Sequence, residues 1–267
     1  MHSITGKQNI KDWRGYPLQA TGDFAFLNER GVTVFPMWHP AYILRAPAYL
    51  PFEINDLRRA LGFLNGTSKL WEWPEIMLIE ADERMAQTLE MILNENAWVG
   101  VDVETAGKDP YSSDLLCIGI AARLKDGTYV SVSVPWPTTS PLIAGLVRAI
   151  LANKRNRKVY QNGNYDLISL SAWNIEHTGN DFDTLIAHRI IAPQVMHGLQ
   201  FIAQTYYLVE PWKVLHAVGD DRKGDEKWKI ARGDRERYHA LRDYNGKDAL
   251  MTIMIFWAMA EQLGVAT

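Results

Sequence analysis

The sequence has a single cysteine in 267 residues, Cys117, and it lies within an apolar run. One thiol forms no internal disulfide and supplies too few ligands for a zinc or iron–sulfur site. We therefore interpret Cys117 as a small buried hydrophobic residue.

The chain also lacks a signal peptide pattern and any apolar run long enough to cross a bilayer. We therefore expect a protein of the cytoplasm, in a bacterial or phage-infected host cell, without a membrane partner.

A large positive charge is missing as well, since the formal net charge is -3. A negative net charge disfavours the binding of duplex DNA by a broad basic surface. Single strands also bind by stacking their bases on aromatic rings, and the chain has 10 Trp and 11 Tyr.

What the sequence does contain is four carboxylates beside apolar elements. In the segment WVGVDVE, the valines alternate with Gly100, Asp102 and Glu104, so a strand places both acids on one face, about 6 to 7 Å apart. Like charges side by side repel each other unless a cation lies between or beyond them. A solvated acidic edge strand is the alternative explanation.

Asp166 and Asp248 each lie in a predicted helix. Asp166 falls in the first turn of an amphipathic stretch that follows the strand 158–162, where a carboxylate is either a helix cap or a ligand. Asp248 lies in the apolar stripe of a C-terminal helix, one turn after Tyr244 on the same face. A structural Tyr–Asp hydrogen bond is the alternative there. Together the acids are the hard oxygen ligands that Mg²⁺ or Mn²⁺ prefers.

The order Asp-x-Glu, Asn-x-x-x-Asp and Tyr-x-x-x-Asp resembles the three exonuclease motifs of the DEDD superfamily, in the subtype with tyrosine in the third motif. It is most similar to the proofreading domain of family A DNA polymerases, which also has Gln-Asn before the second motif, here Gln161-Asn162. The segment FDTLIAH resembles a helix that this family places between the motifs, so Asp183 reads as a helix start rather than a fifth ligand.

This resemblance implies a 3′→5′ exonuclease that acts on single-stranded DNA ends, with a DNA polymerase as a candidate partner. It implies two divalent cations, Mg²⁺ or Mn²⁺, bound by Asp102, Glu104, Asp166 and Asp248. Tyr244 would orient the attacking water, while Thr105 and Asn162 would contact the substrate. Two alternatives stay open: an RNase D-like enzyme that trims RNA 3′ ends, and an inactive nucleic-acid-binding module.

The first 66 residues differ from this pattern. The segment VFPMWHPAYILR, which contains His39, resembles the HPAYLLR motif near the end of family 4 uracil-DNA glycosylases, but that family's four cluster-binding cysteines have no counterpart. We interpret 1–66 as a glycosylase C-terminal fragment, 67–74 as a linker and 75–267 as the exonuclease domain. The fragment would be a structural appendage, or would await a partner that carries the missing glycosylase half, and we expect no uracil excision. A His-Pro turn before a core helix is the alternative.

The expected fold is α/β. The pattern predicts strands at 75–79 and 98–104, a hairpin at 115–134, and helices at 82–93 and 140–153, with helices dominating after 162. The resemblance implies an RNase H-like fold, a mixed central sheet flanked by helices, with a small N-terminal α/β appendage. The charged segment 212–237 is either a loop that closes over substrate or a solvated insertion.

Overall fold

The computed structural model describes residues 1–77, 82–95, 97–213 and 235–265, and these form two compact units. One unit holds residues 1–72 together with 189–213. The other holds the described residues of 73–188 and 235–265, and it contains all four predicted acids. The first boundary falls inside the predicted linker, whereas the grouping of 189–213 with the N-terminal residues was not anticipated from the sequence.

The second unit is built on a six-stranded mixed sheet of order β1-β4-β3-β2-β5-β6. Strands β2, β3 and β4 are antiparallel neighbours, whereas β5 runs parallel to β2, β6 to β5, and β1 to β4. The strand bounds are β1 Ile76–Met77, β2 Val99–Thr105, β3 Leu115–Arg123, β4 Tyr129–Pro135, β5 Lys158–Tyr160 and β6 Phe182–Asp183. The mixed central sheet of the RNase H-like expectation is therefore confirmed.

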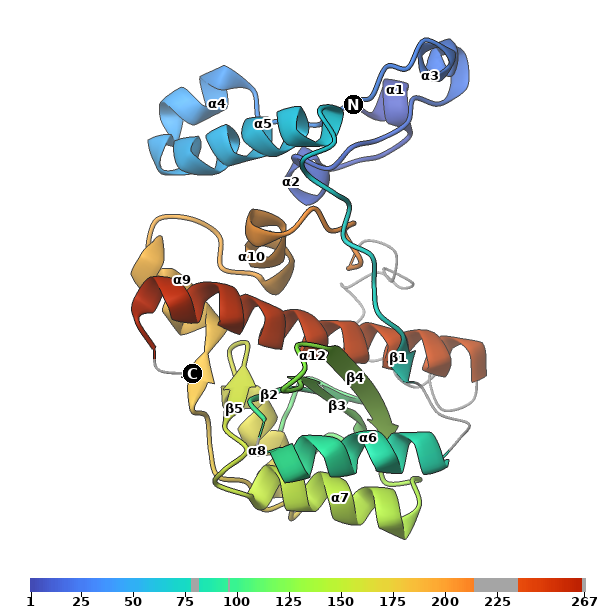
Figure 1. Ribbon diagram of the computed structural model, residues 1–267, viewed down its shortest axis with the longest axis vertical. Helices are drawn as coiled ribbons and strands as arrows, with labels where there is room; N and C mark the ends of the chain where they lie inside the picture. The colour runs from blue at the N-terminus through green and yellow to red at the C-terminus, as the bar shows by residue number, and fades with distance from the viewer. Residues whose placement is uncertain (78–81, 96, 214–234, 266–267) are drawn as a thin grey trace. The chain divides into compact units, whose positions relative to one another are not determined.

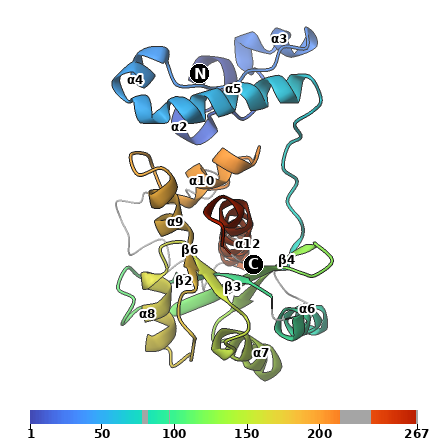
Figure 2. The ribbon, with the colours of Figure 1, turned by 60° about the vertical axis from the view of Figure 1, so that its left-hand side comes forward.

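Helices cover both faces of this sheet, as Figures 1 and 2 show. Helices α6 (Asp82–Glu95) and α7 (Pro141–Ala152) lie on one face, and α12 (Arg235–Leu263) crosses the other. Helix α8 (Asn164–Ala172) follows β5, and α9 (Thr184–Ile191) follows β6. The predicted strands, hairpin and helices are all present within the described residues, while 214–234, most of the predicted charged segment, lies outside them. None of the described helices meets the length and hydropathy needed to cross a membrane.

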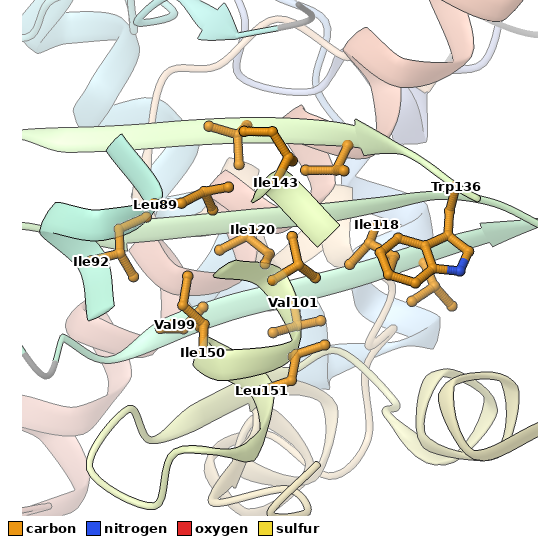
Figure 3. Close-up of a cluster of buried hydrophobic side chains, with 14 of the residues drawn as sticks. Leu89, Ile92, Val99, Val101, Ile118, Ile120, Trp136, Ile143, Ile150 and Leu151 are labelled. Carbon is orange, nitrogen blue, oxygen red and sulfur yellow. The ribbon is translucent and has the colours of Figure 1, made fainter. Parts of the chain in front are cut away.

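The main hydrophobic core lies between the sheet and the pair α6 and α7. Figure 3 shows Leu89 and Ile92 of α6 packed with Ile143 and Ile150 of α7 over the valines of β2. Each of these side chains is fully buried. The strict alternation of β2 therefore sends its valines into this core and leaves Gly100, Asp102 and Glu104 to face α12.

Helix α12 lies unusually close to that opposite face, and glycines make the approach possible. A Cβ atom added to Gly100 would overlap the carbonyl oxygen of Ala249, and one added to Gly119 on β3 would lie 2.8 Å from the carbonyl oxygen of Asn245. Both distances are too short for a real side chain. The backbone of α12 therefore rests directly on β2 and β3, which fixes where its own side chains point.

The N-terminal unit is helical, which differs from the expected α/β appendage. Its described residues pair as β-structure only at one isolated bridge, Leu18 with Val34. Its elements are α1 His2–Thr5, α2 Ile10–Trp13, η1 Gly22–Phe24, α3 Phe26–Glu29, α4 Pro40–Arg45, η2 Pro47–Tyr49, α5 Leu50–Leu64 and α10 Leu199–Tyr206. Short helices need tertiary contacts to persist, so the packing within this unit determines its structure.

A buried ion pair joins three parts of this unit. The Arg14 guanidinium lies 2.5 Å from the Asp56 carboxylate of α5, and both side chains are fully buried. The same guanidinium donates to the Thr205 hydroxyl of α10 at 3.2 Å and stacks over the ring of Phe201. Because removing one partner leaves an uncompensated buried charge, this contact ties α10 firmly to the N-terminal residues.

His39, the histidine of the glycosylase-like motif, is exposed and caps helix α4. Its Nδ1 accepts a hydrogen bond from the backbone N–H of Ala41 at 3.1 Å, and Pro40 is the first helical residue. A side-chain acceptor at this position satisfies a backbone donor that the helix itself leaves open. This geometry is a His-Pro turn at the start of a helix, the alternative to a glycosylase motif.

We predict that Gly100→Ala lowers the free energy of unfolding by about 1–3 kcal/mol, because the added methyl overlaps the Ala249 carbonyl and pushes α12 from the sheet. Chemical denaturation measures this difference. Gly145→Ala is the matched control, since that glycine lies within α7 with open space around it and alanine favours a helix by roughly 0.5–1 kcal/mol. Equal stability of the Gly100→Ala variant and the parent would contradict the close approach.

Candidate functional site

The site begins on β2, where Asp102 and Glu104 are half-buried and face α12. Across the antiparallel pair their neighbours on β3 are Gly119 and Cys117, two small residues that leave room for the acids. Cys117 is buried, and burial followed by the charges of Glu104 and Asp102 raises the pKa of its thiol. The expectation of a buried, unreactive cysteine agrees with this placement.

Asp166 reaches the site from the first turn of α8 and is buried. Its Oδ1 accepts a hydrogen bond from the backbone N–H of Val103 at 2.9 Å. Strand β5 pairs with β2 at Val99 and Gly100. The N–H of Val103 therefore lies beyond the end of the hydrogen-bonded ladder between these two strands. The bond therefore ties Asp166 to the backbone of the residue that separates the two acids of β2.

The ionisation of Asp166 reflects these surroundings. Its pKa rises from 3.8 to about 7, because burial penalises the charged form and the carboxylates of Asp183 and Asp248 add repulsion, while the Val103 bond opposes the rise. A buried carboxylic acid that holds its proton this tightly becomes a stable anion when a cation approaches.

Helix α12 supplies Tyr244 and Asp248, one turn apart. Asp248 is buried, and the Tyr244 hydroxyl is hydrogen-bonded to its carboxylate. Burial, then the charges of Asp248, Glu104 and Asp102, raise the pKa of Tyr244 well above its usual value of 10.0. Three acids from two elements therefore act on one phenol, and that phenol stays protonated at neutral pH.

The two predicted substrate contacts differ in their exposure. The Thr105 side chain is buried, and its hydroxyl bonds to the carbonyl oxygen of Gly107 at 2.8 Å and to the hydroxyl of Tyr165. Asn162 is exposed and has a positive φ of 60°, which turns the chain between β5 and α8. Thr105 is thus placed to hold the loop after β2, whereas Asn162 offers its side chain to solvent.

Asp183 begins helix α9, as the sequence predicted. Its Oδ1 accepts hydrogen bonds from the backbone N–H groups of Leu185 and Ile186, at 2.9 and 3.3 Å. It also accepts from the N–H of Asn162 and Gly163, and so stabilises the turn before α8. The carboxylate is used as a helix cap and a turn anchor.

One polar residue of the site, Asn245, was not predicted from the sequence. It is fully buried, and its side-chain Nδ2 donates to the Oδ2 of Asp102 at 2.8 Å and to the backbone oxygen of Asp102 at 3.0 Å. The signal that was available is a polar amide directly after Tyr244, at a position where the helix meets the sheet. Sequence alone does not reveal that this side chain points toward Asp102.

The donor set fits a hard divalent cation. Within the described ranges, no three acidic, histidine or cysteine side chains are already gathered as a complete metal site. All four predicted ligands are nevertheless carboxylates, and the charge of Asp248 adds to burial in raising the pKa of Asp166. Carboxylate oxygens around a buried acid with a raised pKa are the chemistry that Mg²⁺ or Mn²⁺ stabilises.

Comparison with known proteins identifies a family for most of the chain. The sequence model of a family described as "3'-5' exonuclease" matches residues 76–264. No curated protein matches the chain.

Several solved structures are similar at low identity. The polymerase domain of Pol1 from M. smegmatis, in complex with DNA primer-template and dNTP, is 17% identical with a TM-score of 0.48, over 71% of this chain and 28% of that one. Escherichia coli RNase D is 14% identical with a TM-score of 0.46, over 72% and 46%. Brucella melitensis NrnC with bound Mg²⁺ is 18% identical with a TM-score of 0.40, over 64% and 76%. This chain thus spans less than half of the first two proteins.

We predict that Asp166→Asn changes how stability depends on pH in EDTA. Because the pKa of Asp166 is 3.8 before folding and about 7 after it, the folded protein binds the proton more tightly. This contribution to the free energy of unfolding is fully present below pH 4 and is lost as pH rises to 7, by on the order of a few kcal/mol. Urea denaturation from pH 4 to 8 should show the decline in the parent and a smaller one in the variant. Parallel curves would contradict the prediction.

Proposed function

The chain belongs to the 3′-5′ exonuclease family, and on that premise we propose that it removes nucleotides from the 3′ ends of single-stranded DNA with two Mg²⁺ or Mn²⁺ ions. The observation that supports this most is the convergence on Tyr244, whose pKa is raised by burial and then by the charges of Asp248, Glu104 and Asp102. With Asp166 bonded to the backbone between the two β2 acids, the residues of all three motifs occupy one region of a single unit.

In this proposal Asp102, Glu104, Asp166 and Asp248 hold the cations. When bound, the cations acidify a water molecule and neutralise charge on the scissile phosphate. Tyr244 keeps its proton, since its pKa lies far above neutrality, and its hydroxyl orients the attacking water by a hydrogen bond. That role corresponds to the tyrosine subtype of the superfamily.

Single-stranded substrate is favoured by charge and by exposed aromatic surface. The net charge of -3 provides no excess of cations for gripping duplex phosphates. The loop after β2 presents Tyr111, whose side chain is 74% exposed, as a surface on which a base can stack. Asn162, also exposed, is the second candidate contact. The Gln161-Asn162 pair favours DNA over RNA, and trimming of RNA ends is the competing outcome of the experiment below.

For the N-terminal residues we propose a structural role within this enzyme, with no uracil excision. His39 is exposed and is used as a helix cap, which is a structural role. Arg14 and Asp56 are used to hold α10. A DNA polymerase, or a protein carrying the missing glycosylase part, remains the proposed partner in a bacterial or phage-infected cytoplasm.

We predict that Asp248→Asn and Asp102→Ala each abolish metal-dependent cleavage while the protein stays folded, because each removes a ligand and relieves carboxylate repulsion. The assay uses 5′-labelled single-stranded DNA and RNA of one sequence, with Mg²⁺, Mn²⁺ or EDTA. Asp243→Asn is the matched control: it lies on the same helix and pairs with Lys247 at 2.6 Å. Residual activity within tenfold of the parent would reject the ligand assignment, and cleavage of RNA alone would reject DNA as substrate.

We predict that Tyr244→Phe slows turnover by roughly 10² to 10⁴ while Mn²⁺ binding is retained, because the ring still packs and only the water-orienting hydroxyl is lost. Single-turnover cleavage measures the rate, and calorimetry measures the binding. If the variant turned over at the parental rate, Tyr244 would be a packing residue. The proposal that its hydroxyl orients the attacking water would then be wrong.

A further inference from the structure

We propose that Asn245 is a positioning residue for the metal site, which orients the Asp102 carboxylate without neutralising it. The effect of Asn245 on catalysis rests on the proposed function. Its effect on Asp102 rests only on hydrogen bonds among buried groups.

The Asn245 amide grips Asp102 at two points. Its Nδ2 donates to the carboxylate Oδ2 at 2.8 Å and to the backbone oxygen of the same residue at 3.0 Å. Both partners accept hydrogen bonds only, so they require the NH₂ end of the amide. Two bonds to one residue fix the rotation of the Asp102 side chain relative to its strand.

The other end of the amide is held from β4. The Ser133 hydroxyl donates to Asn245 Oδ1 at 2.7 Å, and Ser133 is fully buried. Gly119 lies on β3, the strand between β2 and β4. It leaves the space in which the amide lies, since a Cβ atom there would be 2.9 Å from Asn245 Oδ1. The chain Ser133–Asn245–Asp102 therefore connects β4, α12 and β2 through one amide.

The chemistry of the amide explains why it suits this place. A lysine or arginine bonded to Asp102 would compensate its charge and compete with a cation for the oxygens. A neutral amide occupies one direction on Oδ2 and leaves the full negative charge on the carboxylate. Groups that orient a metal ligand from behind typically contribute about 10–100-fold to metal affinity or activity.

Ser131 provides a matched comparison on the same strand. Its hydroxyl donates to the backbone oxygen of Gly246 at 2.8 Å, and it is fully buried. It thus makes the same kind of bond between β4 and α12 as Ser133 does, but to the helix backbone instead of the Asn245 amide. Loss of either hydroxyl removes a buried hydrogen bond between β4 and α12, so stability alone does not distinguish them.

The test measures Mn²⁺ binding by calorimetry in the absence of substrate, for the full chain and for Asn245→Ala, Ser133→Ala and Ser131→Ala. We expect the dissociation constant to rise roughly 10–100-fold for Asn245→Ala, less for Ser133→Ala and not for Ser131→Ala. In cleavage assays, raising the Mn²⁺ concentration should restore turnover of Asn245→Ala, with KM for the oligonucleotide unchanged. If Asn245→Ala does not fold, the contrast between the two serine variants still decides the question.

Parental Mn²⁺ affinity in folded Asn245→Ala, or equal losses in both serine variants, would overturn the positioning role. A parent that binds Mn²⁺ but does not cleave, together with a weakened Asn245→Ala variant, would reject the nuclease proposal and leave the positioning role intact. A parent that binds no Mn²⁺ would reject both.

Discussion

The close contact between α12 and the sheet is the constraint on which the site depends. Because Gly100 and Gly119 have no side chains, the backbone of α12 rests on β2 and β3, and Asn245 meets Asp102 directly. Were the helix one methyl group further away, Tyr244 and Asp248 would withdraw from the β2 acids. Two strand glycines thus determine the spacing of a site to which they contribute no functional group.

Electrostatics explains how the acids are held together. Neutral donors orient them: the Val103 backbone N–H binds Asp166, and the Asn245 amide binds Asp102. Neither donor carries a positive charge, and burial raises the pKa of Asp166 to about 7 although the Val103 bond opposes the rise. Without a cation, repulsion among these carboxylates lowers the free energy of unfolding. A bound divalent cation would replace this repulsion with attraction and so stabilise the folded protein.

The N-terminal residues take part in the structure of the matched family region. Residues 76–264 match the exonuclease family, yet α10 within that range packs with residues 1–72, through Arg14 and the carbonyl oxygen of Gln204, to which Arg59 donates. Burial of Arg59 lowers its pKa to about 10, so it remains charged at neutral pH. The N-terminal residues are thus hydrogen-bonded to a helix that lies within the matched family region.

Within the second unit, the sequence by itself determined the strands and helices around the motifs, the face of β2 that carries Asp102 and Glu104, and the pairing of Tyr244 with Asp248, because these follow from periods of two and of three to four residues. Only the tertiary structure decided the rest. The bond from Val103 to Asp166 spans 63 residues and that from Asn245 to Asp102 spans 143, and no local pattern records such distances. The same holds for the grouping of α10 with the N-terminal residues. Local periodicity fixes which way a side chain leaves its element, whereas packing between distant elements decides what it meets.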